Sequence, residues 1–339
     1  MKAIIWTKYG PLDGLQLQEV EKPVPKDNEV LIKVHAATVT AGDTEMRKLK
    51  LPYSLGLPIR LYTGFRQPTR VKILGQELAG VIEALGKDVT RFKEGDEVFG
   101  TTGFAFGSYA EYNCLPAGST ESALAIKPAN VSFEEAAAAP TAGLEAIHFM
   151  RIAGLQSGQH LLINGAGGSI GTFMLQLAKL SGAQVTAVDS AAKLDMLRAL
   201  GADRVIDYTR EDFAASDQTY DVILDVVGRG SYARSVRSLK PNGFYLLANP
   251  SLSTIFRRFW TSLTSSKKVV LQPSGQSLEE LLQLKELIEA GKVKVVVDRS
   301  FSLEKTAEAH AYVETGQKKG NVVIAVEPGT AGAARDAES

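Results

Sequence analysis

Cysteine is nearly absent from this sequence, because Cys114 is the single cysteine among 339 residues. One thiol excludes an internal disulfide and any zinc lobe built from several cysteines, and it fits a reducing compartment. Histidine is scarce as well, and the four that occur are scattered without the spacing of metal ligands: His35, His148, His160 and His310. Neither residue type indicates a metal site.

An excess of one charge and long apolar runs are also missing. Lys plus Arg and Asp plus Glu both number 38, so the net charge is zero and no overall field favours nucleic acid. No apolar run approaches the roughly 18 residues of a membrane span. The first ten residues are too short and too strand-like for a signal peptide. We therefore expect a cytoplasmic protein with no membrane span and no nucleic-acid partner.

Residues 161–189 carry the strongest motif. An apolar run, Leu161–Ile163, leads into a glycine-rich turn, Gly165–Gly171, and a helix-periodic stripe follows as far as Gly182. A second β-rich run, Val185–Val188, ends in Asp189, about twenty residues after the turn, as a dinucleotide-binding unit requires. Glycines let the backbone approach a pyrophosphate, and a helix N-terminus offers free N–H groups. The predicted cofactor-binding residues of the turn are Ala166, Gly167, Gly168, Ser169, Ile170 and Gly171.

The secondary-structure pattern of the sequence differs between its first and its later part. Short β-type runs separated by Pro, Gly and Asp-Asn turns occupy residues 1–45 and 77–115. From Ser132, where Ser132–Glu135 reads as a capping box, helices and strands alternate, which predicts a doubly wound parallel sheet. We predict an α/β protein with a β-rich domain at 1–128, a dinucleotide-binding domain at 129–290, a return to the first domain at 291–328 and a disordered tail at 329–339.

Two basic, aromatic segments each allow two interpretations. Residues 46–76 contain Lys and Arg but no acid, so they form either a solvated loop or a lid that favours an anionic or flat aromatic substrate. Residues 251–268 form either an interfacial amphipathic helix or a cover for a cleft or subunit contact. Residues 269–271 read as an edge strand open to pairing in a dimer.

Several motifs resemble those of the medium-chain dehydrogenase/reductase superfamily, and together they span residues 1–327. They are Gly75–Val81, Phe92–Gly100, Gly107–Tyr112, Ala166–Gly171, Leu200–Asp203 with Asp207-Tyr208, and Gly320–Val323. The resemblance implies a GroES-like β-rich catalytic domain, a Rossmann domain and a homodimer. Zinc enzymes of this superfamily use Cys and His ligands, whereas Thr40, Gln76 and Thr141 stand at those positions here. The chain is therefore similar to the zinc-free, quinone oxidoreductase-like branch, which includes zeta-crystallin and enone reductases.

The resemblance implies further cofactor contacts. Asp189 ends the second strand, where an acid favours NAD, but Ser190, Lys193 and Tyr208 match positions that hold the 2′-phosphate in NADPH-dependent relatives. We favour NADP(H) and keep NAD(H) as the alternative. Thr141, Glu145 and Asn321 complete the predicted cofactor contacts. Glu145 replaces a Thr that faces the nicotinamide in the family, so its carboxylate either acts on the ring or points away.

The absence of zinc-ligating residues disfavours alcohol oxidation, which needs a polarised oxygen. Hydride addition to a quinone or to the β-carbon of an enone remains, with a small, flat carbonyl compound as the substrate. A developing oxyanion needs a donor, and the candidates are Tyr53, Thr40 and Arg47, with Asp43 as a polar neighbour. Tyr53 alternatively only packs, and Asp43 alternatively caps a turn. An alcohol dehydrogenase and a non-catalytic dinucleotide-binding sensor or structural protein remain the alternative functions.

Overall fold

A computed structural model describes residues 1–49, 53–118, 123–228, 231–249, 252–271, 275 and 277–327, so the predicted tail at 329–339 lies outside the described residues. The chain forms two compact units. The first unit comprises Met1–Thr141, Gln276–Glu289 and Val295–Ser339, and the second comprises Ala142–Gly275 and Ala290–Lys294. Each unit is described by itself.

These boundaries differ from the predicted ones, because residues 129–141 and 276–289 belong to the first unit. The physical reason is a set of hydrogen bonds around Asn130. Its side-chain amide donates to the carbonyls of Ile288 and Glu289, and the Ala129 N–H donates to the Glu289 carboxylate. The helix that ends at Glu289 is thereby fixed to the first unit.

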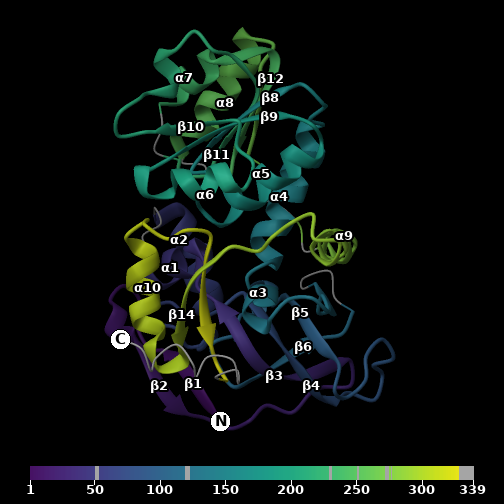
Figure 1. The fold of residues 1–339 in the computed structure, drawn as a ribbon. Helices are drawn as coiled ribbons and strands as arrows, with labels where there is room; N and C mark the ends of the chain where they lie inside the picture. Colours follow the sequence, from purple (N-terminus) through teal and green to yellow (C-terminus); the bar gives the residue numbers. More distant parts are fainter. Residues whose placement is uncertain are drawn as a thin grey trace, which may run out of the picture. The chain divides into compact units, whose positions relative to one another are not determined.

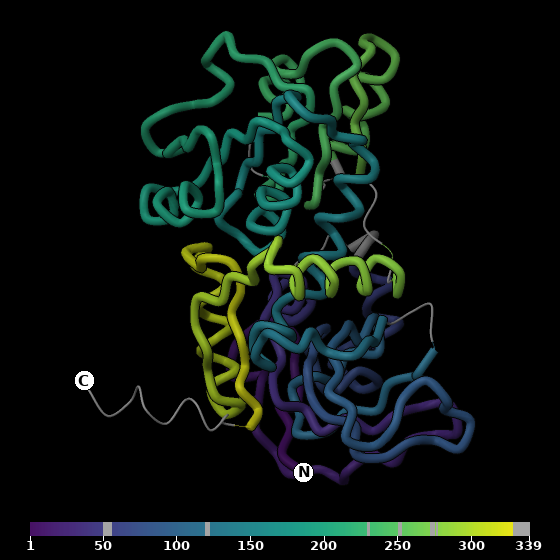
Figure 2. Tube along the Cα trace, turned by 45° about the vertical axis from the view of Figure 1, so that its right-hand side comes forward, coloured from purple at the N-terminus to yellow at the C-terminus, as the bar shows by residue number. Residues whose placement is uncertain are grey.

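A mixed sheet forms the centre of the first unit. Its strand order is β14-β15-β3-β4-β5-β7, and β6 also pairs with β3. The strands are β3 (Glu29–Thr38), β4 (Glu77–Leu85), β5 (Glu97–Thr101), β6 (Tyr112–Pro116), β7 (Leu124–Ile126), β14 (Val297–Ser302) and β15 (Asn321–Ala325). A separate antiparallel pair is formed by β1 (Lys2–Trp6) and β2 (Leu15–Glu19). Figure 2 shows the yellow C-terminal segment beside the purple N-terminal strands, so the chain returns to its first domain as predicted.

The helices of the first unit include one inside the basic segment 46–76. They are α1 (Ala41–Lys48), α2 (Tyr53–Thr63), α3 (Phe133–Ala137), α9 (Leu278–Glu289) and α10 (Thr306–Glu314), with 3-10 turns at Leu12–Gly14, Gly103–Ala105 and Leu303–Lys305. Ser132 and Glu135 form the predicted capping box at the start of α3. The β-type run Val293–Val297 in the returning segment predicts a strand there, but β14 begins only at Val297 and the preceding residues connect the two units.

The second unit is built on a parallel sheet of strand order β10-β9-β8-β11-β12-β13 (Figure 1). The strands are β8 (His160–Asn164), β9 (Gln184–Asp189), β10 (Arg204–Asp207), β11 (Tyr220–Asp225), β12 (Leu239–Leu247) and β13 (Lys268–Val270). The order reverses between β8 and β11, which confirms the predicted doubly wound sheet and places a ligand crevice at the carboxyl ends of these strands. The sheet ends at β13, as predicted.

The chain passes from the first unit to the second within α4 (Pro140–Ala153). The other helices of the second unit are α5 (Ser169–Leu180), α6 (Leu194–Ala199), α7 (Tyr232–Arg237) and α8 (Leu252–Thr264), with 3-10 turns at Ala191–Lys193 and Phe213–Ala215. Within the part of the chain that the structure describes, no helix has the length and apolarity to cross a bilayer.

Candidate active site

The glycine-rich turn joins β8 to α5 in the second unit. The N–H groups of Gly165 and Ala166 both donate to the carbonyl of Val188 at the end of β9, at 3.0 and 3.1 Å. Gly165 has φ 89°, a conformation that favours glycine. At Gly171 a Cβ atom would lie 2.5 Å from the Gly165 carbonyl oxygen, so only glycine allows α5 to pack this closely against the turn. Gly168 caps α5 without a side-chain hydrogen bond, which leaves first-turn N–H groups suited to a phosphate.

Asp189, at the end of β9, forms a buried ion pair with Lys193. The Lys193 ammonium lies 3.1 Å from the Asp189 carboxylate, and both side chains are less than one-tenth exposed. The Gly167 and Ser190 N–H groups each donate to this carboxylate at 2.8 Å. The Asp189 carboxylate is therefore fully engaged within the protein, and its charge is compensated by a lysine.

The structure brings the predicted nucleotide-selecting residues together. Ser190 and Lys193 follow Asp189 in the turn after β9, and the Tyr208 N–H donates to the Asp189 carbonyl from the end of the adjacent β10. The Tyr208 side chain is exposed. A hydroxyl, an ammonium and a phenol at the ends of two neighbouring strands suit a charged group on a ribose.

The first unit buries two carboxylates near one another. Glu77, at the start of β4, accepts the Thr38 hydroxyl at 2.5 Å and the Thr141 N–H at 2.8 Å. Asp43, in α1, accepts the N–H of Thr40 at 2.9 Å and its hydroxyl at 2.6 Å. Glu77 is 1% exposed and Asp43 is fully buried. Neither has a Lys or Arg ion-pair partner among the described residues.

Burial has the largest effect on the pKa values of Asp43 and Glu77. It raises the pKa of Asp43 to about 6 and the pKa of Glu77 to about 7, while the hydrogen bonds from Thr40 and Thr38 act in the opposite direction. The charge of Asp43 raises the pKa of Glu77 further. Burial and the same two acids raise the pKa of the neighbouring Tyr109 phenol. The pair is therefore able to hold a proton near neutral pH.

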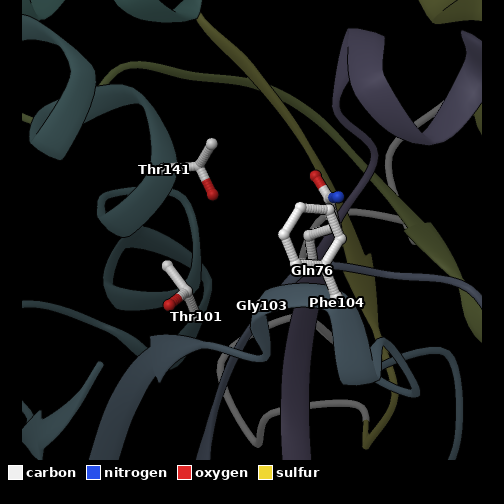
Figure 3. Close-up of a pocket in the computed structure, with 5 residues that line it drawn as sticks. All are labelled: Gln76, Thr101, Gly103, Phe104 and Thr141. Carbon is white, nitrogen blue, oxygen red and sulfur yellow. The ribbon is translucent and has the colours of Figure 1, made fainter. Parts of the chain in front are cut away.

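The first unit also contains a pocket. Its lining residues are Gln76, Thr101, Gly103, Phe104 and Thr141. Figure 3 shows Thr141 on one side of the hollow, facing Phe104 and Gln76 on the other. Thr141 connects the pocket to the acids, because its N–H donates to Glu77 and its hydroxyl also hydrogen-bonds there. The pocket combines an aromatic wall with hydroxyl and amide groups, a lining suited to a small carbonyl compound.

The predicted catalytic residues have different outcomes. Thr40 and Asp43 form the capping box of α1, so the capping alternative for Asp43 is confirmed. Arg47 is 1% exposed, and its guanidinium donates to the Gly10 carbonyl and to the Glu314 carboxylate of α10. The structure thus contradicts its assignment as a substrate donor. Tyr53 begins α2, but its side chain lies outside the described residues, so its role stays a prediction.

Three cofactor contacts remain predictions. Thr141 lines the pocket in the first unit. Glu145 is half-buried in α4. Asn321, at the start of β15, is buried, and its side-chain amide donates to the Val296 carbonyl at 3.1 Å.

Sequence reasoning missed Glu77, Thr101 and Phe104. An acid at the start of the apolar strand Glu77–Leu85 was the available signal for Glu77, because a carboxylate in such a run must be buried or paired. Thr101 is the last residue of β5 and Phe104 follows that strand, and neither carried a local signal.

The donor groups do not fit a zinc ion. Over the described ranges, no three His, Cys, Asp or Glu side chains converge as metal ligands. Thr40 and Thr141 offer hydroxyls and Gln76 an amide, and tetrahedral zinc sites in proteins use thiolate, imidazole and carboxylate ligands.

Comparison with known proteins agrees with this arrangement. The model of the alcohol dehydrogenase GroES-like domain matches residues 26–125, and the zinc-binding dehydrogenase model matches residues 200–324. The chain is 35% identical over 336 residues to 2-methylene-furan-3-one reductase of Solanum lycopersicum, covering 96% of this chain and 79% of that one. It is 33% identical over 337 residues to a chloroplastic NADPH-dependent alkenal/one oxidoreductase of Arabidopsis thaliana, with the same coverage of 96% and 79%.

Solved structures extend the likeness to the whole fold. The quinone oxidoreductase from Coxiella burnetii superimposes with a TM-score of 0.86 and 30% identity, covering 96% of this chain and 99% of that one. The Escherichia coli quinone oxidoreductase complexed with NADPH gives a TM-score of 0.79 and 25% identity, covering 96% and 100%. This chain belongs to the medium-chain dehydrogenase/reductase superfamily, in its quinone oxidoreductase-like branch.

Proposed function

We propose that the protein transfers hydride from NADPH to a quinone or to the β-carbon of an α,β-unsaturated carbonyl compound, without zinc. The observation that carries this is the coexistence of an intact dinucleotide turn with hydroxyl and amide side chains at all three zinc-ligand positions. The relatives named as alkenal/one and quinone oxidoreductases support the same acceptor class. When bound, the nicotinamide supplies the hydride, and the protein supplies binding and polarity.

NADPH is favoured because the acid that would oppose it is already neutralised. An acid at the end of the second strand repels a 2′-phosphate when its charge is free. Here Lys193 pairs with Asp189, while Ser190 and Tyr208 extend the polar surface beside it. The NADPH named with the Escherichia coli structure and with the Arabidopsis relative supports this choice.

The pocket residues are proposed to position the acceptor carbonyl. Reduction of a quinone or enone consumes one hydride and one proton, so a donor must serve the oxygen or carbon that becomes an anion. The Thr141 hydroxyl and the Gln76 amide are the donors on the pocket wall. Glu77 lies behind Thr141 and provides a buried proton acceptor or donor through that hydroxyl.

A homodimer in the cytoplasm is part of the same proposal. The free side of the edge strand β13 supports pairing with a second copy, and a lone cysteine supports a reducing compartment.

Steady-state oxidation of NADPH and NADH by metal-stripped protein, against a panel of quinones and enones, tests the proposal. We expect turnover that survives chelation and a lower KM for NADPH. Alcohol oxidation restored only by zinc would instead identify an alcohol dehydrogenase. Cofactor binding with no turnover on any acceptor would identify a sensor.

A further inference from the structure

The helix α8 of the second unit turns its apolar face away from that unit. Ile255, Phe256, Phe259, Trp260 and Leu263 are each between 48% and 78% exposed. Their spacing places all five on one face of the helix, because residues four apart share a face. A surface helix ordinarily buries such a stripe, so this orientation is inverted.

The opposite, polar face of α8 attaches the helix to its unit. Thr261 is buried, and its hydroxyl forms a 2.8 Å hydrogen bond with the Tyr232 hydroxyl. The Arg257 guanidinium lies 5.9 Å from the centre of the same tyrosine ring. These contacts hold the polar face of α8 against the second unit. The apolar face therefore points outward because of the way the helix is attached.

The charged residues of α8 and of the segment that follows it have one sign. Residues 252–271 contain four basic side chains and no acid: Arg257, Arg258, Lys267 and Lys268. Lys267 donates to the carbonyls at the end of α7, and the Lys268 ammonium lies over the ring of Phe244, which fixes both cations beside the helix. Basic side chains therefore border the exposed apolar face of α8.

The basic side chains beside the apolar face favour an anionic binding partner over a second copy of the same surface. A second copy of the same surface would bring two sets of cations together without an acid to pair them. An anionic lipid surface complements the border, and its acyl boundary accepts Phe, Leu and Trp side chains. Tryptophan in particular favours the membrane–water interface.

We propose that α8 is a membrane-docking helix that lies in the plane of an anionic phospholipid surface. The side chains of Phe256, Phe259, Trp260 and Leu263 enter the boundary between headgroups and acyl chains. Arg258 and Lys268 face the lipid phosphates. This proposal concerns the second unit alone and is independent of the proposed catalytic function.

The intrinsic fluorescence of Trp260 can report membrane binding. Trp6 and Trp260 are its two tryptophans, and Trp6 is fully buried in the first unit. Purified full-length protein is mixed with phosphatidylcholine vesicles that do or do not contain roughly a third of phosphatidylglycerol. We expect Trp260 emission to shift to the blue and to lose accessibility to acrylamide only with the anionic vesicles. Because the border acts through charge, high salt should weaken the binding.

Variants separate the apolar and basic contributions. The double variant Phe256→Ser/Phe259→Ser should bind anionic vesicles at least about tenfold more weakly in co-sedimentation, and Arg258→Glu should also weaken it. The matched control is Phe65→Ser, which removes an equally exposed phenylalanine from the first unit. Unchanged circular dichroism and melting temperature would show that all variants fold.

Three results would overturn the proposal. The first is an unchanged Trp260 signal with anionic vesicles. The second is a dimer in light scattering that Phe256→Ser/Phe259→Ser converts to monomer, which would assign the face to a second copy. The third is a Trp260 already shielded from acrylamide in lipid-free monomer, which would mean that the protein itself covers the face.

Discussion

Asp189 of the second unit and Glu77 of the first are both buried carboxylates beside a predicted ligand site, yet their environments differ in one respect. Asp189 has a lysine ammonium at 3.1 Å together with two backbone N–H donors. Glu77 has the hydroxyls of Thr38 and Thr141 and one N–H donor, and its charged neighbour is a second acid, Asp43. Burial penalises an unpaired charge, so Asp189 is accompanied by a cation, whereas burial raises the pKa of Glu77 and makes that carboxylate a site for a proton.

This difference matches what each unit binds in the proposed function. The second unit must hold the adenosine ribose and its phosphates, which hydride transfer does not change and which suit a constant electrostatic environment. The first unit must accompany a reaction that consumes a proton, which requires a group that titrates near the working pH. The four predictions below test that contrast, from the largest expected effect to the smallest.

Removing the lysine from the buried pair should have the largest effect. Lys193→Met leaves the Asp189 charge buried without a cation, and breaking such a pair costs about 3 kcal/mol of unfolding free energy. Urea denaturation measures the loss. The double variant Asp189→Asn/Lys193→Met removes both charges and should recover most of the stability. Equal losses in the single and double variants would show that the loss does not come from an unpaired Asp189 charge.

Glu77 should make stability fall as pH rises. Because its folded pKa is raised to about 7, it stabilises the fold fully below its ordinary value of 4.5, and this contribution is lost as pH rises through about 7. Between pH 5 and 8 the loss amounts to about 2 kcal/mol. Glu77→Gln cannot ionise and should flatten the pH dependence of the unfolding free energy. An unchanged slope would mean that Glu77 stays ionised throughout.

Gly167→Ala tests the packing of the fixed-charge site. A Cβ atom at this position would lie 2.5 Å from the Lys193 Cδ and 3.0 Å from an Asp189 carboxylate oxygen. We expect the ion pair to shift and the NADPH Kd to rise about tenfold, or 1.4 kcal/mol. Gly118→Ala is the control, since its Cβ would meet nothing within 4 Å. Fluorescence titration with NADPH measures both variants.

Tyr208→Phe should have the smallest effect. Loss of one phenolic hydrogen bond to a 2′-phosphate should raise the KM for NADPH by about threefold to tenfold. The KM for NADH should not change, because NADH lacks that phosphate. An equal change for both nucleotides would place Tyr208 elsewhere on the cofactor or only in the fold.

The sequence predicted the second unit more completely than the first. The glycine turn, Asp189 and the alternating strands are local patterns, and local patterns largely determine a doubly wound sheet. In the sequence, Asp189 and Lys193 indicate opposite nucleotide choices. Their spacing of four residues allows an ion pair, but whether both side chains are buried depends on the packing of the turn against them.

The first unit depends on contacts between distant residues. Arg47 pairs with Glu314, 267 positions away, and no local pattern identifies that partner. Asn130 similarly fixes the end of α9, which moved a predicted domain boundary. The buried acids Glu77 and Asp43 come together only when β4 and α1 meet. Composition and periodicity do not indicate which distant residues come into contact, so the pocket and its acids are identified only from the structure.

The strand β15 has a consequence for the order in which the protein is made. It inserts between β14 and β3, and its residues Val323–Ala325 pair with Ala36–Thr38 near the start of the chain. The six strands of the second unit all lie between residues 160 and 270 and leave the ribosome earlier. We therefore expect the second unit to complete its sheet during translation, whereas the first waits for the last strand. Until then β3 has an open edge at Ala36–Thr38, and a chain that stalls before residue 321 keeps that edge available for aggregation.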